Sequence, residues 1–167
     1  MANQPTGNSY PARTVRLDNS VWIDGLLFSF LLTGEDTQGG FSLTRAIQRQ
    51  GCEPPFHIHR NADETFYVVE GILTFYVAGE SLEAPAGTTV FVSRGRQHSF
   101  AVETATADTL ILFTPAGTEN FFKEISTPAL TLTLPPLPEG PPDVGRMVAV
   151  AAKYDIEITG PPPRAQS

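Results

Sequence analysis

Residues 51–71 have the sequence GCEPPFHIHRNADETFYVVEG, and this stretch holds most of the chain's chemically distinctive side chains. The whole chain has three histidines, and two of them, His57 and His59, stand here with Glu64 five residues after the second. Side chains alternate between the two faces of a β-strand, so residues two apart point the same way. A strand over this pair would therefore aim both imidazoles at one point.

Two further groups are expected to reach that point. The sequence RNAD at 60–63 is typical of a turn, which would let the chain reverse and bring Glu64, at the start of the next strand, close to the histidines. The third histidine, His98, would have to come from a strand across a barrel. A single strand histidine is more often structural than a ligand, but the combined spacing favours a site.

Three imidazoles and one carboxylate form a ligand set typical of transition metals. Such a set suits Mn, Fe, Co, Ni, Cu or Zn better than Ca or Mg. In a six-coordinate site it would leave two positions open, as a catalytic centre requires. The sequence therefore predicts one divalent transition metal per subunit, with the ligands His57, His59, Glu64 and His98.

The rest of the chain favours a single all-β domain. Its 167 residues fit one core, and 14 glycines and 15 prolines indicate frequent turns. Short apolar or alternating runs recur at a spacing typical of sandwiches and barrels, and none between residues 41 and 115 has the period of a long helix. The apolar run at 21–32 is expected to be a buried strand. The expected strand-bearing stretches are 21–32, 41–50, 65–79, 88–95, 98–104 and 109–115.

Three regions are expected along the chain. Residues 1–13 should form a loose N-terminal segment, and residues 14–126 a β-barrel closed by a short helix, with Thr118 as its N-cap. Residues 127–167 should form a proline-rich connector, a second helix from Asp143 to about Tyr154, and a tail packed on or near the barrel. The residues expected to pack from these two helices are Phe121, Phe122 and Ile125 on the first and Met147, Val148, Ala151 and Ala152 on the second.

Composition argues against several classes of partner. The net charge is −7 and basic residues are not clustered, which argues against nucleic acid. The single cysteine, Cys52, excludes an internal disulfide, and the N-terminus lacks the pattern of a secretory signal. The run at 21–32 is too short to span a bilayer. We expect a cytoplasmic protein without membrane partners, and a homodimer that covers exposed sheet edges.

The same stretch carries a resemblance to a known family. Residues 51–71 match the first cupin motif, G-x5-H-x-H-x4-E-x6-G, at every specified position. Residues 87–102 resemble the second motif, G-x5-P-x-G-x2-H-x3-N, with Ser93 in place of its proline and Val102 in place of its asparagine. The resemblance implies a jelly-roll barrel with short C-terminal helices, and it implies that the same four residues bind the metal.

From about residue 20, the chain is also similar to bacterial single-domain cupins related to quercetin dioxygenase. This resemblance implies that dioxygen cleaves a flavonol or similar enolic aromatic molecule, with Glu64 as both ligand and base. Cupins also include isomerases, cyclases and decarboxylases that use no oxygen, and domains that only bind a small molecule. All of these remain alternatives.

Strand parity predicts the walls of the cavity. Phe66 and Val68 should follow Glu64 inward, and Phe100 should follow His98, giving an apolar pocket for a flat small-molecule substrate. Each could equally be plain core packing. No role is assigned to Cys52, Tyr67, Tyr76, Arg45 or Arg49.

Overall fold

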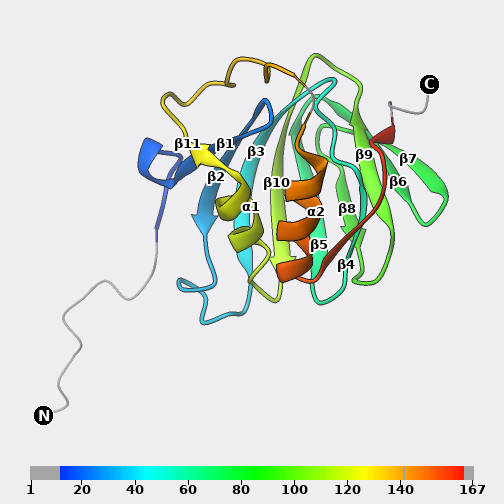
Figure 1. Cartoon of the computed structure of the whole chain (residues 1–167), viewed down its shortest axis with the longest axis horizontal. Helices are drawn as coiled ribbons and strands as arrows, with labels where there is room; N and C mark the ends of the chain where they lie inside the picture. The colour runs from blue at the N-terminus through cyan, green and yellow to red at the C-terminus, as the bar shows by residue number, and fades with distance from the viewer. Residues whose placement is uncertain (1–11, 141, 164–167) are drawn as a thin grey trace, which may run out of the picture.

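Two antiparallel β-sheets face each other in a computed structural model of the chain, which describes residues 12–140 and 142–163 (Figure 1). The first sheet has the strand order β11 (Thr127–Pro128), β1 (Ser20–Ile23), β2 (Leu26–Leu32), β3 (Ser42–Arg49), β10 (Thr106–Thr114), β5 (Asp63–Glu70) and β8 (Thr89–Val92). The second has the order β12 (Ile156–Gly160), β4 (Phe56–His59), β9 (His98–Val102), β6 (Ile72–Val77) and β7 (Glu80–Pro85). A short 3-10 helix (Leu17–Asn19) and the helices α1 (Glu119–Ile125) and α2 (Val144–Lys153) complete the fold.

The core lies between the two sheets. Its largest fully buried side chains include Phe66 and Phe113 from the first sheet and Phe75 and Leu73 from the second. The inward residues recur at every second position along β5, which matches the period of a strand with one buried face. The all-β jelly-roll with short C-terminal helices is therefore confirmed. Of the loose segment predicted at 1–13, residues 1–11 lie outside the described residues.

The apolar run at 21–32 forms a hairpin, so the prediction of one continuous strand there was wrong. Strands β1 and β2 pair from Ser20 and Ser29 down to Ile23 and Leu26. Asp24 and Gly25 form the turn with φ angles of 43° and 89°. Positive φ at both central positions is the geometry that Asp-Gly provides in a two-residue hairpin, and it matches the right-handed twist of the strands.

Strand β3 turns its polar residues toward the core. Ser42, Thr44 and Gln48 are fully buried, whereas the apolar Leu43 and Ile47 lie on the other face and are only half-buried. Arg45, on the same outward face, binds both carboxylate oxygens of Asp108 through its Nε, at 3.0 and 3.1 Å. The sequence pattern did not reveal this inversion.

The C-terminal helix begins where the sequence predicts. The Asp143 side chain accepts a hydrogen bond from the backbone N–H of Arg146 at 2.9 Å, and the helix ends at Lys153. Its buried face differs in part from the prediction, because Val150 and Ala151 are buried while Val148 and Ala152 are exposed. Positions three and four apart share one face of a helix, so Met147, Val150 and Ala151 form the side that packs.

The first helix is held by a carboxylate rather than by its N-cap hydroxyl. Thr118 occupies the N-cap position as predicted, but its side chain makes no capping hydrogen bond. Instead the buried Glu119 accepts from the backbone N–H groups of Gly34, at 2.8 Å, and Gly117, at 2.6 Å. Burial alone would raise the pKa of Glu119, but these two donors outweigh it and lower the pKa. The helix then packs beside α2 (Figure 1).

Glu119→Ala should lower the free energy of unfolding by about 1–3 kcal/mol, because two part-buried N–H groups lose their acceptor. The lowered pKa means that the wild-type advantage is present above the ordinary pKa of a glutamate and is lost as the pH falls through the folded value. Urea denaturation of both proteins at neutral and acid pH measures this. The exposed neighbour provides the control Asn120→Ala, which should change little. Equal destabilisation by the two variants would contradict the role of Glu119.

The sequence predicts a protein without membrane partners that forms a homodimer. No helix within 12–140 or 142–163 is long and apolar enough to cross a membrane. The homodimer stays a prediction, and light scattering on the purified protein would test it.

Candidate metal centre

Four side chains from the two sheets converge at one end of the barrel interior. One ligand atom from each of His57, His59, Glu64 and His98 lies within 4.8 Å of the other three. The Glu64 Oε2 atom is 2.8 Å from His98 Nε2 and 3.2 Å from His59 Nε2. All four predicted residues are thus brought together, and three of them, His59, Glu64 and His98, are buried.

The strand that carries His98 does not lie where the sequence predicts. His98 does not come from across the barrel, because β9 is the neighbour of β4 and His98 pairs directly with His57 in the same sheet. Glu64 is the residue that comes from the opposite sheet. The turn at 60–63 therefore carries the chain from one sheet to the other, and the sheet-to-sheet gap is where the ligands face each other.

Backbone carbonyls orient two of the imidazoles. His57 Nδ1 lies 2.9 Å from the carbonyl oxygen of Pro55, and His98 Nδ1 lies 3.0 Å from that of Arg96. A carbonyl can only accept, so Nδ1 carries the proton in each neutral ring and Nε2 presents a lone pair to the centre. This is the arrangement that supports metal-binding histidines in general. The donor set and its orientation fit a divalent transition metal.

Burial and mutual proximity set the charges of the cluster. Burial, with the neighbouring His98 and His59, lowers the pKa of His57 to about 3, so this ring is neutral at physiological pH. Burial would raise the pKa of Glu64, but His59 and His98 outweigh it and lower the pKa. Burial opposes a charge on His98, yet its bond to Glu64 raises the pKa of that ring. The centre therefore combines an ionised carboxylate with a neutral ligand ring.

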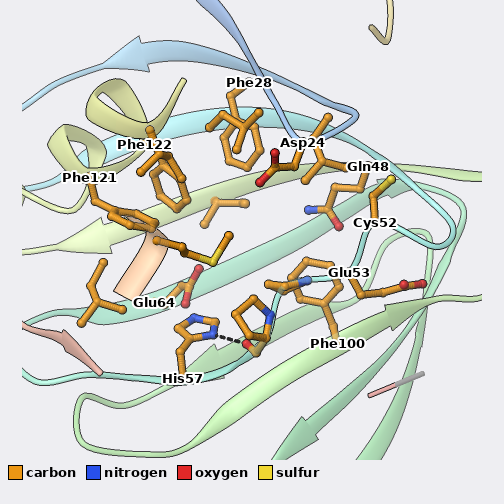
Figure 2. A pocket seen from close by; sticks show the side chains of 18 of the residues that line it. Asp24, Phe28, Gln48, Cys52, Glu53, His57, Glu64, Phe100, Phe121 and Phe122 are labelled. Carbon is orange, nitrogen blue, oxygen red and sulfur yellow. Dashed lines mark hydrogen bonds between the residues drawn. The ribbon is translucent and has the colours of Figure 1, made fainter. Parts of the chain in front are cut away.

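An apolar cavity of about 130 Å³ opens beside the cluster (Figure 2). Phe66 and Phe100 line it, as strand parity predicts, together with His57, His59 and Glu64. Val68 is fully buried in the core but does not line this cavity, so its predicted place in the pocket was wrong. It sits four residues along β5 from Glu64, beyond the part of the strand that borders the open space.

Other walls of the cavity come from segments that the sequence analysis did not connect with the site. They are the β1–β2 hairpin, α1, α2 and β12, contributing Ile23, Leu26, Phe28, Phe121, Phe122, Ile125, Met147, Ile156 and Ile158. Strand β12 pairs with β4, with Ile156 opposite His59 and Ile158 opposite His57. The alternation in IEIT at 156–159 was the available signal for this strand. The C-terminal segment thus holds the ligand strand in place.

A wider groove of about 760 Å³ adjoins the cavity. The residues that line both spaces are Asp24, Cys52, Glu53, Pro55, Met147 and Ile158. The rest of the groove is formed by the proline-rich connector and the end of β12, including Leu137, Pro138 and Pro161. The cavity therefore has an outer vestibule with two carboxylates among its shared lining residues.

Five further residues, to which the sequence assigns no role, lie outside the group of four proposed ligands. Cys52 lines the cavity, and burial raises the pKa of its thiol, which opposes thiolate chemistry. Tyr67 is 44% exposed on the outward face of β5, and Tyr76 packs edge-on against Phe56. The outward Arg45 is in the ion pair described above, and Arg49 donates to the carbonyl of Pro135 at 3.0 Å. None of them joins the metal cluster.

Comparison with known proteins identifies the barrel. Residues 45–115 match the family described as a Cupin domain, and no curated protein matches the chain. Among solved structures, an RmlC-like cupin from Shewanella frigidimarina is 22% identical and has a TM-score of 0.55, covering 64% of this chain and 93% of its own. A predicted oxalate decarboxylase from Thermotoga maritima is 19% identical with a TM-score of 0.54, covering 62% and 99%. The nucleoside dehydratase Pac13 of Streptomyces is 16% identical with a TM-score of 0.53, covering 65% and 86%.

At 16–22% sequence identity, these solved structures show only that the fold is shared. They share the barrel while differing in what they are described as doing, so the activity has to be argued from the site. Residues 45–115 are thus similar to a Cupin domain, and the solved cupin structures share the fold of the barrel.

Proposed function

We propose that this protein is a metal-dependent dioxygenase that cleaves a flavonol or a similar enolic aromatic molecule. The observation that carries the proposal is the placement of an ionised, buried carboxylate and three histidines beside a cavity walled by aromatic rings. The aromatic walls suit a flat apolar substrate, and the cluster suits its one chelating polar edge. The metal would be a divalent transition ion held by His57, His59, Glu64 and His98.

The chain's own residues would contribute three things. A bound transition ion would act as a Lewis acid toward an enolic oxygen and offer an open position for dioxygen. Glu64 would accept the enol proton, which its ionised state permits once coordination has made that enol acidic. Phe66 and Phe100 would hold the rings of the substrate and exclude water from the reacting edge.

Dioxygen uptake tests this function. The protein is reconstituted separately with Mn, Fe, Co, Ni, Cu and Zn, its metal content is measured, and quercetin is supplied. Consumption of dioxygen in step with loss of quercetin, with at least one metal, is the expected result. Absence of uptake by protein loaded with every one of these metals would overturn the dioxygenase proposal.

A second candidate is an oxygen-independent isomerase, cyclase or decarboxylase. The observation in its favour is that the ionised Glu64 lines the cavity, where it could take a proton from a bound substrate without dioxygen. Equal turnover with and without air would favour this candidate. Saturable binding without a product, under every metal, would instead favour a non-catalytic small-molecule-binding cupin.

A further inference from the structure

One polar side chain in the cavity wall has an unused hydrogen-bonding atom. Gln48 lies on the inward face of β3, is 1% exposed and lines the cavity (Figure 2). Its Nε2 donates to Thr109 Oγ1 at 2.9 Å. Its Oε1 is buried and has no hydrogen-bond partner among the described residues. A buried acceptor left unpaired is costly, so such a group in a cavity wall points to a ligand.

The orientation of this amide follows from its neighbour. The Thr109 hydroxyl has one proton, and it donates that proton to the carbonyl of Ala46 at 3.4 Å. With this proton directed to Ala46, the hydroxyl oxygen accepts from Gln48 Nε2, which leaves the amide oxygen unpaired. The unused atom is an acceptor, and its complement on a ligand is an O–H or N–H donor.

Gln48 is far along the barrel from the metal cluster. On the shared neighbour β10, Gln48 pairs with Ala107 and Glu64 pairs with Phe113. These two positions are six residues apart on β10, so the backbones of Gln48 and Glu64 lie at different levels of the barrel. Both side chains nevertheless reach the same cavity, and Figure 2 shows Gln48 and Asp24 on one side of it and Glu64 and His57 on the other. A ligand that touches both ends must be elongated.

The carboxylates that line the vestibule further limit the chemical class of the ligand. Asp24 and Glu53 are among the residues shared by the cavity and the outer groove. Their carboxylates disfavour an anionic group at this end of the ligand, since like charges repel in a partly dehydrated site. A neutral donor, such as a phenolic hydroxyl, meets both conditions.

We infer that Gln48 determines substrate specificity by accepting a hydrogen bond from a neutral donor at the end of an elongated aromatic substrate remote from the metal. This inference rests on the proposed function, because it takes the metal cluster as the anchor for the other end of the substrate. It adds a chemical requirement that the metal site alone does not impose: a hydroxyl or N–H on the distal ring.

The test compares ligands that differ only in the distal donor. The probes are 3-hydroxyflavone and its 7-hydroxy and 4′-hydroxy derivatives, which share the same metal-binding edge. Dissociation constants are measured without air on zinc-loaded wild type, Gln48→Met and Gln50→Met. The last is the matched control, since Gln50 is exposed and follows the same strand. Thermal melting and zinc content are recorded for each protein.

Wild type and Gln50→Met should bind one of the hydroxylated probes about 5- to 50-fold more tightly than 3-hydroxyflavone, as expected for one buried hydrogen bond. In Gln48→Met this ratio should fall to about 1, with zinc content unchanged. A purely structural glutamine would instead lower the melting temperature and weaken all probes equally. Gln48→Leu, which is shorter, serves if the methionine variant does not fold.

These measurements distinguish failure of the Gln48 inference from failure of the flavonol proposal. If the probes bind and Gln48→Met keeps the wild-type ratio, the role of Gln48 is overturned while the metal cavity stands. If no probe binds to the zinc-loaded protein, or binding is the same without zinc, the flavonol proposal is overturned and the inference about Gln48 falls with it.

Discussion

Replacing His98 with alanine should leave a protein that no longer retains one divalent metal ion per chain. His98 pairs directly with His57 and touches Glu64, so its loss removes one of the four proposed ligands. Loss of a residue that merely supports a metal ligand costs about 10- to 100-fold in affinity, so loss of the ligand itself should cost at least about 100-fold. Elemental analysis after dialysis against a competing chelator measures the retained metal.

The control for this variant is Gln97→Ala. Gln97 is the exposed residue directly before His98, and its side chain bonds Thr159 rather than the cluster. This control should retain the wild-type metal content. Full metal retention by a folded His98→Ala protein would contradict the role of His98 as a ligand.

Glu64→Gln should lower the turnover number for the oxygenase substrate by about 100- to 10,000-fold, the range expected when a general base is lost. Glutamine keeps the size of the side chain but cannot carry the negative charge that the neighbouring histidines stabilise in Glu64. Rates are compared at equal metal loading, so that loss of metal is separated from loss of the base. The measurement is dioxygen consumption per metal-loaded chain.

The matched control is Glu70→Gln, on the same strand. Glu70 is exposed at the far end of β5, so the same chemical change there should leave the rate near that of wild type. A Glu64→Gln protein that is fully loaded and turns over at the wild-type rate would remove Glu64 from the mechanism.

The sequence predicted that the four side chains lie together, because most of the relevant geometry is local. Alternation along one strand places His57 and His59 on one face, and a turn of four residues suffices to bring Glu64 to them. The position of His98 depends on which strands become neighbours, a long-range property that single-strand periodicity does not encode. That is why His98 was predicted from across the barrel but lies beside His57.

The cavity was harder to predict for the same reason. Phe66 and Phe100 follow from the parity of strands that already carry ligands, whereas Ile156 and Phe122 reach the site only through the packing of the C-terminal segments. Gln48 was missed because β3 reverses the usual arrangement and buries its polar residues. An interpretation that assigns only apolar residues to the inward face of a strand does not identify a polar residue buried there.

Anomalous diffraction from crystals of the metal-loaded protein, collected above and below the absorption edge of the loaded ion, locates the metal ion in the chain. We predict one anomalous peak per chain, within bonding distance of the Nε2 atoms of His57, His59 and His98 and of the Glu64 carboxylate. A loaded crystal with its peak elsewhere, or with no peak among these four side chains, would contradict the metal centre and the function built upon it.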